Sequence, residues 1–513
     1  MSGEQTPITG FQLILLTVGV SLAVFMNVLD TSIANVAIPT IAGDLAISPD
    51  QGTWVITSFT VSMAIALPLS GWFGRRLGEV KLFIGSTLLF SLLSLMCGLA
   101  PNLTSLVVFR VLQGAVAGPM IPLSQSLLLN NYPKEKHGTA LSIWSMTAVV
   151  APVAGPLLGG WITDNYNWPW VFYINVPVGL IAVWITWALL RGRETPTERR
   201  PIDGIGLGLL VIGVAALQIM LDKGNDLAWF SSDTIRILAV TAVAALSFFV
   251  AWELTEEHPV VDLSLFGQRN FTVATLAITF GFLTYFANVV VFPLWLQTQM
   301  GYTATQAGIA SAPIGVLAVV VAPCMGLLMQ RFDLRLLIMT AFLIFAAVSF
   351  WNVQFNTGVT LTQLMWPRLI FGAGMPLFFV PLMSMAFTGL PPQRVASASG
   401  LINFLRMLGA GFGASLGITL WDRREALHDA RLSDVVSTTS VWHQGQLAGL
   451  KALGLDAARS TAELAHAIQQ QAFMQAMDDF SWLSGCIFMV LVAFVWLGRR
   501  NASAARPVVD SGH

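Results

Sequence analysis

An acidic residue inside a long apolar segment is the side chain of this sequence best placed to do chemistry. Asp30 lies within the mostly apolar residues 11–41. A charged side chain in hydrocarbon is costly, so an acid inside a membrane segment is a functional candidate by default. Burial favours the neutral form of a carboxyl group, which suits a group that must take up and release a proton. Asp30 is therefore the predicted proton carrier; the alternative is that it only satisfies a neighbouring helix.

A deep basic residue and three amides are the candidate companions of that acid. Arg110 lies in another apolar segment and either pairs with Asp30 through helix packing or extends toward a membrane surface. Gln113 lies one turn along the face that carries Arg110. Asn27 shares a helix face with Asp30 and is placed to hydrogen-bond its protonated form, and Asn35 follows about a turn later. We predict that Asp30 and Arg110 couple proton movement and that the three amides bind substrate.

The second half of the chain offers four further candidates. Arg406 is a lone basic residue in an apolar segment, with Asn403 one turn before it. It either receives an anionic group of a substrate or forms a structural ion pair. Tyr285 and Asn288 are predicted to line a cavity, although each could instead face lipid or core. Aromatic surfaces with a few polar groups suit several apolar ligands, so we predict all four as substrate-binding residues.

The composition places these residues in a membrane protein. Of 513 residues, 55% are hydrophobic and only 10% are charged, and the mean hydropathy is +0.72. A soluble domain carries about 25% charged residues. The sequence has no GxxxxGK(S/T) loop for nucleotide phosphates, so we expect no cofactor and infer that an ion gradient supplies the energy. The three scattered cysteines and the net charge of −1 give no reason to expect a metal site, an enzyme or a nucleic-acid partner.

Fourteen apolar segments predict an all-α membrane protein with both termini on one side, because each crossing needs about 20 apolar residues. The segments are 13–38, 53–73, 80–100, 104–128, 138–162, 170–190, 204–221, 234–253, 273–297, 305–329, 335–352, 362–387, 397–421 and 481–498.

Positive charge predicts which side the termini occupy. Sixteen of the 26 Lys and Arg fall on the terminal side, whereas the short loops opposite hold little beyond Lys223. Cytoplasmic loops are enriched in Lys and Arg, so both termini are predicted to be cytoplasmic. The long loop 422–480 is assigned to the outer side, either as a solvated connector or as a docking surface for a partner. The sixteen residues are Arg75, Arg76, Lys81, Lys134, Lys136, Arg191, Arg193, Arg199, Arg200, Arg269, Arg331, Arg335, Arg394, Arg499, Arg500 and Arg506.

Two parts of the chain resemble each other at nearly equal offsets. Residues 71–76 resemble 326–331, 255 positions later, and residues 110–114 resemble 368–372, 258 positions later. Parallel six-helix repeats are the architecture of the major facilitator transporters, whose substrate site lies between the halves. We predict the following parts: an N-terminal six-helix bundle (1–190), an inserted helix pair with linkers (191–269), a C-terminal six-helix bundle that includes loop 422–480 (270–498), and a tail (499–513).

Four motifs make the family resemblance specific. Residues 29–39 resemble the first-helix signature of the fourteen-helix drug:proton antiporters of the major facilitator superfamily. Residues 110–114 resemble the fourth-helix motif, whose arginine is associated with proton transfer. Residues 151–160 resemble the fifth-helix antiporter motif, and residues 168–179 the segment that follows it. In the fifth-helix motif, Gly155, Pro156 and Gly159 are predicted to serve packing, a kink and conformational change.

The loop after the second helix departs from the superfamily pattern. Gly71 and Arg76 match the pattern and are predicted to act in conformational change, but Arg75 stands where an Asp is usual. The gating ion pair of that Asp does not carry over to this chain, and Glu79 and Lys81 are the nearby charges that remain as substitutes.

The resemblance implies proton-coupled efflux of several toxic hydrophobic or amphipathic compounds by alternating access. It extends to the inner-membrane pumps of tripartite systems, which implies an EmrA-like periplasmic adaptor, a TolC-like outer-membrane channel and a bacterial inner membrane. One alternative is an exporter of fatty acids or another defined amphiphile, for which Arg406 would matter more. Another is a membrane sensor or scaffold that kept the fold without transport.

Overall fold

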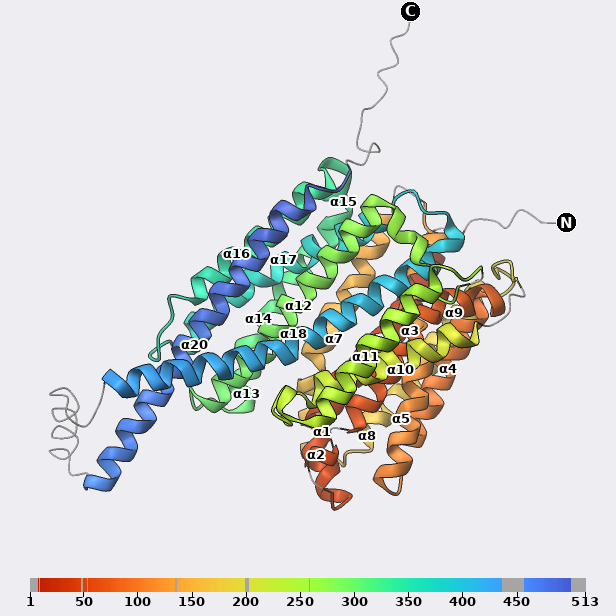
Figure 1. Cartoon of the computed structure of the whole chain (residues 1–513). Coiled ribbons are helices and arrows are strands. Elements are labelled where there is room, and N and C mark those ends of the chain that lie inside the picture. Colours follow the sequence, from red (N-terminus) through yellow and green to blue (C-terminus); the bar gives the residue numbers. More distant parts are fainter. Residues whose placement is uncertain are drawn as a thin grey trace, which may run out of the picture.

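The computed structural model describes residues 8, 10–47, 49–52, 54–133, 136–198, 203–257, 259–435 and 456–499. Within these ranges the chain forms helices and no strand. Figure 1 shows long helices packed side by side. The predicted all-α fold is confirmed.

The helices follow the chain in three parts. The first part contains α1 (Phe11–Asp44), α2 (Pro49–Gly52), α3 (Trp54–Leu77), α4 (Glu79–Gly98), α5 (Leu103–Ala117), α6 (Met120–Asn131), α7 (His137–Asn165), α8 (Trp170–Tyr173) and α9 (Asn175–Leu190). The middle part contains α10 (Gly204–Lys223), η2 (Trp229–Ser231), α11 (Asp233–Glu253) and η3 (Leu263–Gly267). The last part contains α12 (Arg269–Thr298), α13 (Ala304–Ser311), α14 (Pro313–Val321), η4 (Ala322–Cys324), α15 (Met325–Arg331), α16 (Leu334–Asn352), α17 (Leu361–Phe387), α18 (Pro392–Val435) and α20 (Ala457–Val495).

Polar caps fix where the two helices with deep arginines begin. At α5, the Asn102 side chain accepts a hydrogen bond from the backbone N–H of Ser105. At α17, Thr360 and Gln363 form a reciprocal capping box. Arg110 and Arg368 each lie seven residues after the first residue of their helix. Two helical turns span about 11 Å, so both guanidinium groups start from a similar depth.

The number of membrane crossings agrees with the sequence prediction. Thirteen helical stretches of the described residues are long and apolar enough to cross a membrane. The 29-residue helix α7, at the predicted segment 138–162, is the remaining one. Short helices share crossings: α5 continues into α6, and α8 into α9.

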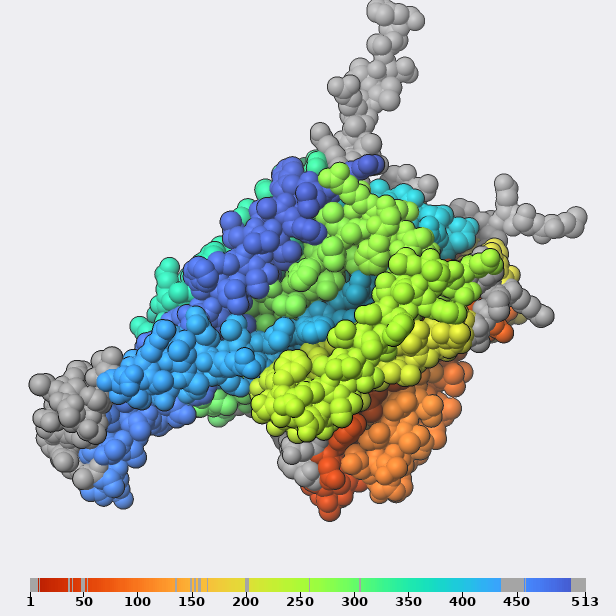
Figure 2. Space-filling model, viewed as in Figure 1, coloured from red at the N-terminus to blue at the C-terminus, as the bar shows by residue number. Residues whose placement is uncertain are grey.

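The helices of the last two crossings extend beyond the apolar segments 397–421 and 481–498. α18 continues to Val435 and α20 begins at Ala457, so both helices enter the segment 422–480 that the sequence assigned to the outer side. Figure 2 shows these two helix ends projecting beyond the rest of the molecule. Apolar composition marks only the part of a helix that lies in hydrocarbon, so hydropathy missed the polar continuations. Residues 436–455 of the predicted loop lie outside the described residues.

Close helix contacts recur at the offsets seen in the sequence. A Cβ at Gly114 would collide with the carbonyl oxygen of Phe59, and a Cβ at Gly372 would collide with that of Ile314. These two pairs are related by shifts of 258 residues for the glycines and 255 for their contacts. Small residues let helix backbones approach in this way. The internal repeat therefore extends from sequence to packing.

Contacts between the two repeats gather near one end of the helices. Gly71 on α3 packs against Ser397 on α18, and Gly326 on α15 packs against Thr139 on α7. The two contacts are again related by the 255 and 258 shifts. We call this end the terminal side, because the last helix ends there. Arg269 at the start of α12 donates to the carbonyl oxygen of Leu497, just past the end of α20.

The middle helices touch both repeats. On α10, Asp222 accepts a hydrogen bond from Thr57 of α3 at 2.5 Å, and the Leu221 carbonyl accepts one from Ser415 of α18. Trp229 donates to Thr419 of α18 at 2.8 Å. Figure 1 shows α10 and α11 side by side across the face of the other helices. The inserted pair therefore bridges α3 and α18.

Candidate functional site

A buried ion pair lies at the centre of the first group of helices. Arg110 Nη1 on α5 lies 2.5 Å from Asp30 Oδ2 on α1, and both side chains are fully buried. The same nitrogen donates to Gln113 Oε1 at 2.8 Å, and Arg110 Nε donates to the carbonyl oxygen of Val55 at 2.9 Å. Of the two sequence alternatives for Arg110, the structure therefore places it against the acid.

The second oxygen of Asp30 has a partner that the sequence analysis missed. Asn175, the first residue of α9, donates Nδ2 to Asp30 Oδ1 at 2.8 Å and also to Ser94 Oγ at 3.0 Å. A polar residue at the start of an otherwise apolar helix was the available signal. Three helices, α1, α5 and α9, thus supply the acid, the base and the amide.

Aromatic rings enclose the guanidinium of Arg110. It lies 4.2 Å from the ring centre of Phe59 and 5.5 Å from that of Phe172. Such cation–π contacts stabilise a desolvated cation by about 2 kcal/mol or more. The rings also exclude water, which strengthens the attraction between Arg110 and the carboxylate. A proton that binds Asp30 must therefore displace a tightly held cation.

Two of the predicted amides make hydrogen bonds away from Asp30. Asn27 donates Nδ2 to the carbonyl oxygen of Ala117 at 3.1 Å, instead of bonding to Asp30. Sharing a helix face with Asp30 did not decide its partner, because the end of α5 places a backbone acceptor within reach of the Asn27 amide. Asn35 is exposed and bonds to the carbonyl oxygen of Thr31 in its own helix. Neither amide contacts the ion pair directly in the described contacts.

A second polar cluster joins α6 to α18. Gln125 Oε1 accepts hydrogen bonds from the Ser399 hydroxyl and, at 3.4 Å, from Asn403 Nδ2. Asn403 also donates to the Ser399 carbonyl at 2.9 Å. All three side chains are buried. Asn403 was predicted as a substrate residue, but here it belongs to a contact between the two repeats.

The fifth-helix glycines lie where close packing requires them. A Cβ at Gly155 on α7 would collide with Ser32 on α1, and Gly159 is buried one turn further along. The helix runs unbroken through position 156. The side chain of Pro156 lies outside the described ones.

The candidates of the last part surround an aromatic cluster. Tyr285 on α12 stacks on Phe371 with ring centres 5.9 Å apart. Asn288 donates to the Thr284 carbonyl at 2.9 Å and to Ser484 Oγ at 3.2 Å. Arg406 on α18 is half-buried, and its guanidinium lies 4.9 Å from the ring centre of Phe282.

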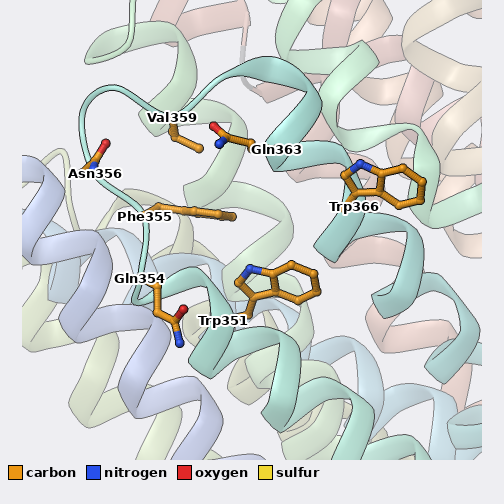
Figure 3. Close-up of a pocket in the computed structure, with 7 residues that line it drawn as sticks. All are labelled: Trp351, Gln354, Phe355, Asn356, Val359, Gln363 and Trp366. Atoms are coloured by element: carbon orange, nitrogen blue, oxygen red, sulfur yellow. The ribbon is translucent and has the colours of Figure 1, made fainter.

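One cavity of about 330 Å³ opens at the connection between α16 and α17. Figure 3 shows Trp351 and Trp366 facing it from the two helices, with amides and Phe355 along the connection. Its lining carries no charged side chain and shares no residue with the ion pair. It is therefore not a site for proton coupling. The lining residues are Trp351, Gln354, Phe355, Asn356, Val359, Gln363 and Trp366.

Comparison with known proteins decides the family. Residues 20–414 match the profile described as "Major Facilitator Superfamily".

The chain belongs to the major facilitator superfamily.

Two curated relatives cover nearly the whole of this superfamily member. It is 48% identical over 497 residues to "Multidrug export protein EmrB" of Escherichia coli (strain K12), which covers 97% of each chain. It is 46% identical over 496 residues to "Fatty acid resistance protein FarB" of Neisseria gonorrhoeae, covering 97% of this chain and 98% of the relative. The superfamily member is a multi-pass membrane transporter and not an enzyme.

A solved structure agrees with the fold. The human organic anion transporter MFSD10 aligns with a TM-score of 0.59 at 12% identity, covering 95% of this chain and 100% of that one. At such low identity the likeness supports the superfamily fold alone.

The departure from the superfamily's second-helix loop has a visible consequence. Arg75, which replaces the usual Asp, donates Nη1 to Ser397 Oγ across the two repeats at 2.9 Å. Glu79 is buried and accepts from Ser126 at 2.7 Å and from Asn130 at 3.3 Å. Arg76 is exposed, with its guanidinium 5.1 Å from the ring centre of Trp72. Arg75, the residue that departs from the superfamily pattern, therefore makes a contact with the other repeat.

Proposed function

We propose that this chain exports several hydrophobic or amphipathic toxic compounds in exchange for protons. The buried Asp30–Arg110 ion pair is the observation that carries the proposal. A transporter needs a group that binds a proton in one state and releases it in another, and an intramembrane acid with a competing cation can do so. The 48% identity to a multidrug export protein supports the substrate class.

Protonation of Asp30 is the coupling step in this proposal. A neutral carboxyl group no longer attracts Arg110, so the pair opens when the proton binds and closes when it leaves. Exchange requires that substrate and proton favour opposite states of this site. Substrate would therefore bind best while Asp30 is ionised and paired.

The conformational change is proposed to be a rocking of the two six-helix halves, 1–190 and 270–498, around the substrate. The inserted segment 191–269 bridges them. Substrate would contact residues of both halves, and close packing at the fifth-helix motif and second-helix loop would limit the movement. The substrate residues are Asn27, Asn35, Gln113, Tyr285, Asn288, Asn403 and Arg406; the conformational residues are Gly155, Pro156, Gly159, Gly71 and Arg76.

We further propose a bacterial inner-membrane location with both termini cytoplasmic. The excess of Lys and Arg on the terminal side supports this orientation. The projecting ends of α18 and α20 would then lie outside the membrane on the periplasmic side. An EmrA-like periplasmic adaptor and a TolC-like outer-membrane channel are the proposed partners, and segment 422–480 is the proposed contact with the adaptor.

The first experiment measures proton movement in liposomes that contain the purified protein. An acidic lumen is imposed, substrate is added, and proton release is compared between wild type and Asp30→Asn. We expect the variant to bind the drug but to lose substrate-triggered proton release. Unchanged proton release in the variant would contradict the role of Asp30. No release in either protein would favour a sensor or scaffold that does not transport.

A second candidate function is the export of fatty acids or another defined amphiphile. The 46% identity to a fatty acid resistance protein favours it. Arg406 also makes no hydrogen bond or ion pair among the described residues, and its Nε is buried. Competition between a drug and a fatty acid in the same liposome assay separates the two functions: a defined exporter would move the acid and ignore the drug.

A further inference from the structure

Arg368 is a buried cation whose charge nothing in the described structure balances. Its exposed fraction is 2%. Nε and Nη2 are buried and donate to no described partner, and none of its nitrogens makes a hydrogen bond or ion pair with a described residue. The guanidinium lies 3.4 Å from the ring centre of Phe292, which covers one of its faces. A ring face offsets only part of the cost of burying a cation.

The helices packed most closely around Arg368 contain no acid. Arg368 lies on α17, which packs most extensively against α12, α14 and α16. None of these four helices contains an Asp or Glu in its sequence. Of the helices that touch α17 less extensively, α7 contains Asp164 as its next-to-last residue, and α18 contains acids only from Asp422 onward. The helices that enclose Arg368 most closely therefore supply no counter-ion.

Comparison of the two repeats shows which residues stand at matching positions around the two arginines. The shift of 258 residues that relates Arg110 to Arg368 relates Asp30 to Asn288 and Gln113 to Phe371. The neutral amide of Asn288 donates hydrogen bonds to Ser484 Oγ and to a backbone carbonyl, so it supplies no negative charge to Arg368. The second repeat therefore has an arginine at the matching position but no acid at the position that matches Asp30.

We propose that Arg368 binds the carboxylate of an amphipathic substrate, which takes the place of the missing acid. A guanidinium presents paired N–H groups that match the two oxygens of a carboxylate. Aromatic rings provide apolar surface for the rest of the substrate. Phe371 stacks with Tyr285, and the ring centre of Phe345 lies 4.4 Å from that of Phe371. Tyr285 and Phe286 are only half-buried, so part of this aromatic surface is exposed. This inference rests on the proposed export function and assigns it acidic amphiphiles as a substrate class.

The test measures binding of laurate to the full-length protein in lipid nanodiscs, with dodecanol as the uncharged probe of equal chain length. Arg368→Gln removes the cation, and Asn288→Asp supplies an internal acid at the position that matches Asp30. We expect either change to weaken laurate binding about 10-fold or more, as loss of about 1.4 kcal/mol would do. Arg368→Lys should retain part of the affinity. Dodecanol binding should change less than about twofold, as expected when no charge is involved.

Two controls make the result decisive. Asn288→Asp keeps every charge of the native protein and adds a partner for Arg368, so it reports on the site even if Arg368→Gln fails to fold. Arg406→Gln tests the other arginine that lacks an acid. Equal laurate affinity in all variants would overturn the proposal, and so would a loss confined to Arg406→Gln.

The test of the proposed export function and the test of carboxylate binding at Arg368 can fail separately. Asp30→Asn should abolish proton coupling and should change laurate and dodecanol binding by the same factor, whereas Arg368→Gln should weaken laurate binding alone. If Asp30→Asn left proton release unchanged, the coupling role would be lost, but the laurate result would still stand or fall on Arg368 alone.

Discussion

The arginine sites of the two repeats share a backbone frame and differ in almost every side chain around it. Arg110 and Arg368 occupy matching positions on α5 and α17, each four residues before a glycine that touches a neighbouring backbone. Around Arg110 stand an acid, two amides and a backbone carbonyl. Around Arg368 stand Phe292 and further rings. The same frame therefore holds a paired cation in one repeat and an unpaired one in the other.

This difference separates two tasks that a proton-driven exporter must perform. A paired acid can exchange its cation for a proton, whereas an unpaired cation can only receive an anion from elsewhere. Burying a charge without a partner costs several kcal/mol, so such a cation persists where function requires it. Proton coupling is accordingly expected in the first repeat, and recognition of an anionic group in the second.

The largest expected effect concerns the stability of the two sites. Arg110→Gln leaves a buried carboxylate without its cation and should lower the free energy of unfolding by about 3–5 kcal/mol. Arg368→Gln leaves no opposite charge behind and should change it by less than about 1 kcal/mol, or increase it. Thermal unfolding of the detergent-solubilised protein, followed by tryptophan fluorescence, measures both. Equal losses in the two variants would mean that Arg368 also has a partner acid.

A polar side chain on the last helix of each repeat provides the next comparison. Asn175→Ala removes a hydrogen bond to the carboxylate of Asp30 and should cost about 1.5–3 kcal/mol, as bonds to charged groups do. Ser484→Ala removes a bond to the neutral Asn288 and should cost about 1 kcal/mol. The same unfolding assay applies, with Ser94→Ala as the control: it loses the bond from Asn175 and the bond to the Phe172 carbonyl but keeps the bond between Asn175 and Asp30. A larger loss for Ser484→Ala would break the proposed contrast between a charged and a neutral site.

The matching glycines at the terminal side should also differ. A methyl group at Gly71 would lie 2.7 Å from Ser397 Cα, whereas one at Gly326 would lie 3.3 Å from Thr139 Cα. Overpacking that a side-chain rotation cannot relieve costs about 1–3 kcal/mol. Gly71→Ala should therefore separate the repeats more than Gly326→Ala does. The measurement is maleimide labelling of Ser70→Cys in a background free of other cysteines, and equal labelling rates would contradict the difference.

The smallest effect is expected at the polar contact between α6 and α18. The repeat positions that match Gln125 and Ser399 are Met383 and Leu141, so this contact has no polar counterpart. Ser399→Ala should weaken closure of the terminal side by about 0.5–1.5 kcal/mol, the net value of one hydrogen bond. The same labelling at position 70 would detect it as a several-fold faster reaction. No change in rate would assign the closure to the glycine contacts instead.

The sequence alone determined the membrane fold, the fourteen crossings and the deep position of Arg110. These features follow from composition, segment length and motif spacing, which are properties of single segments. The same reasoning marked only the apolar parts of α18 and α20, because their polar ends are helical without being apolar. It also identified Asp30 without its partners, since the cost of an acid in hydrocarbon is visible whatever surrounds it.

Only the tertiary structure decided which side chains meet. Helical periodicity tells which residues share a face of one helix, but not which other helix lies against that face. Packing brings Arg110 and Asn175, 80 and 145 residues away in the sequence, to Asp30 and directs Asn27 to a backbone carbonyl instead. It also shows that Arg368 makes no ion pair with a residue that the structure describes. Whether a buried charge is satisfied is a property of the assembled bundle, because its partners come from helices that are distant along the chain.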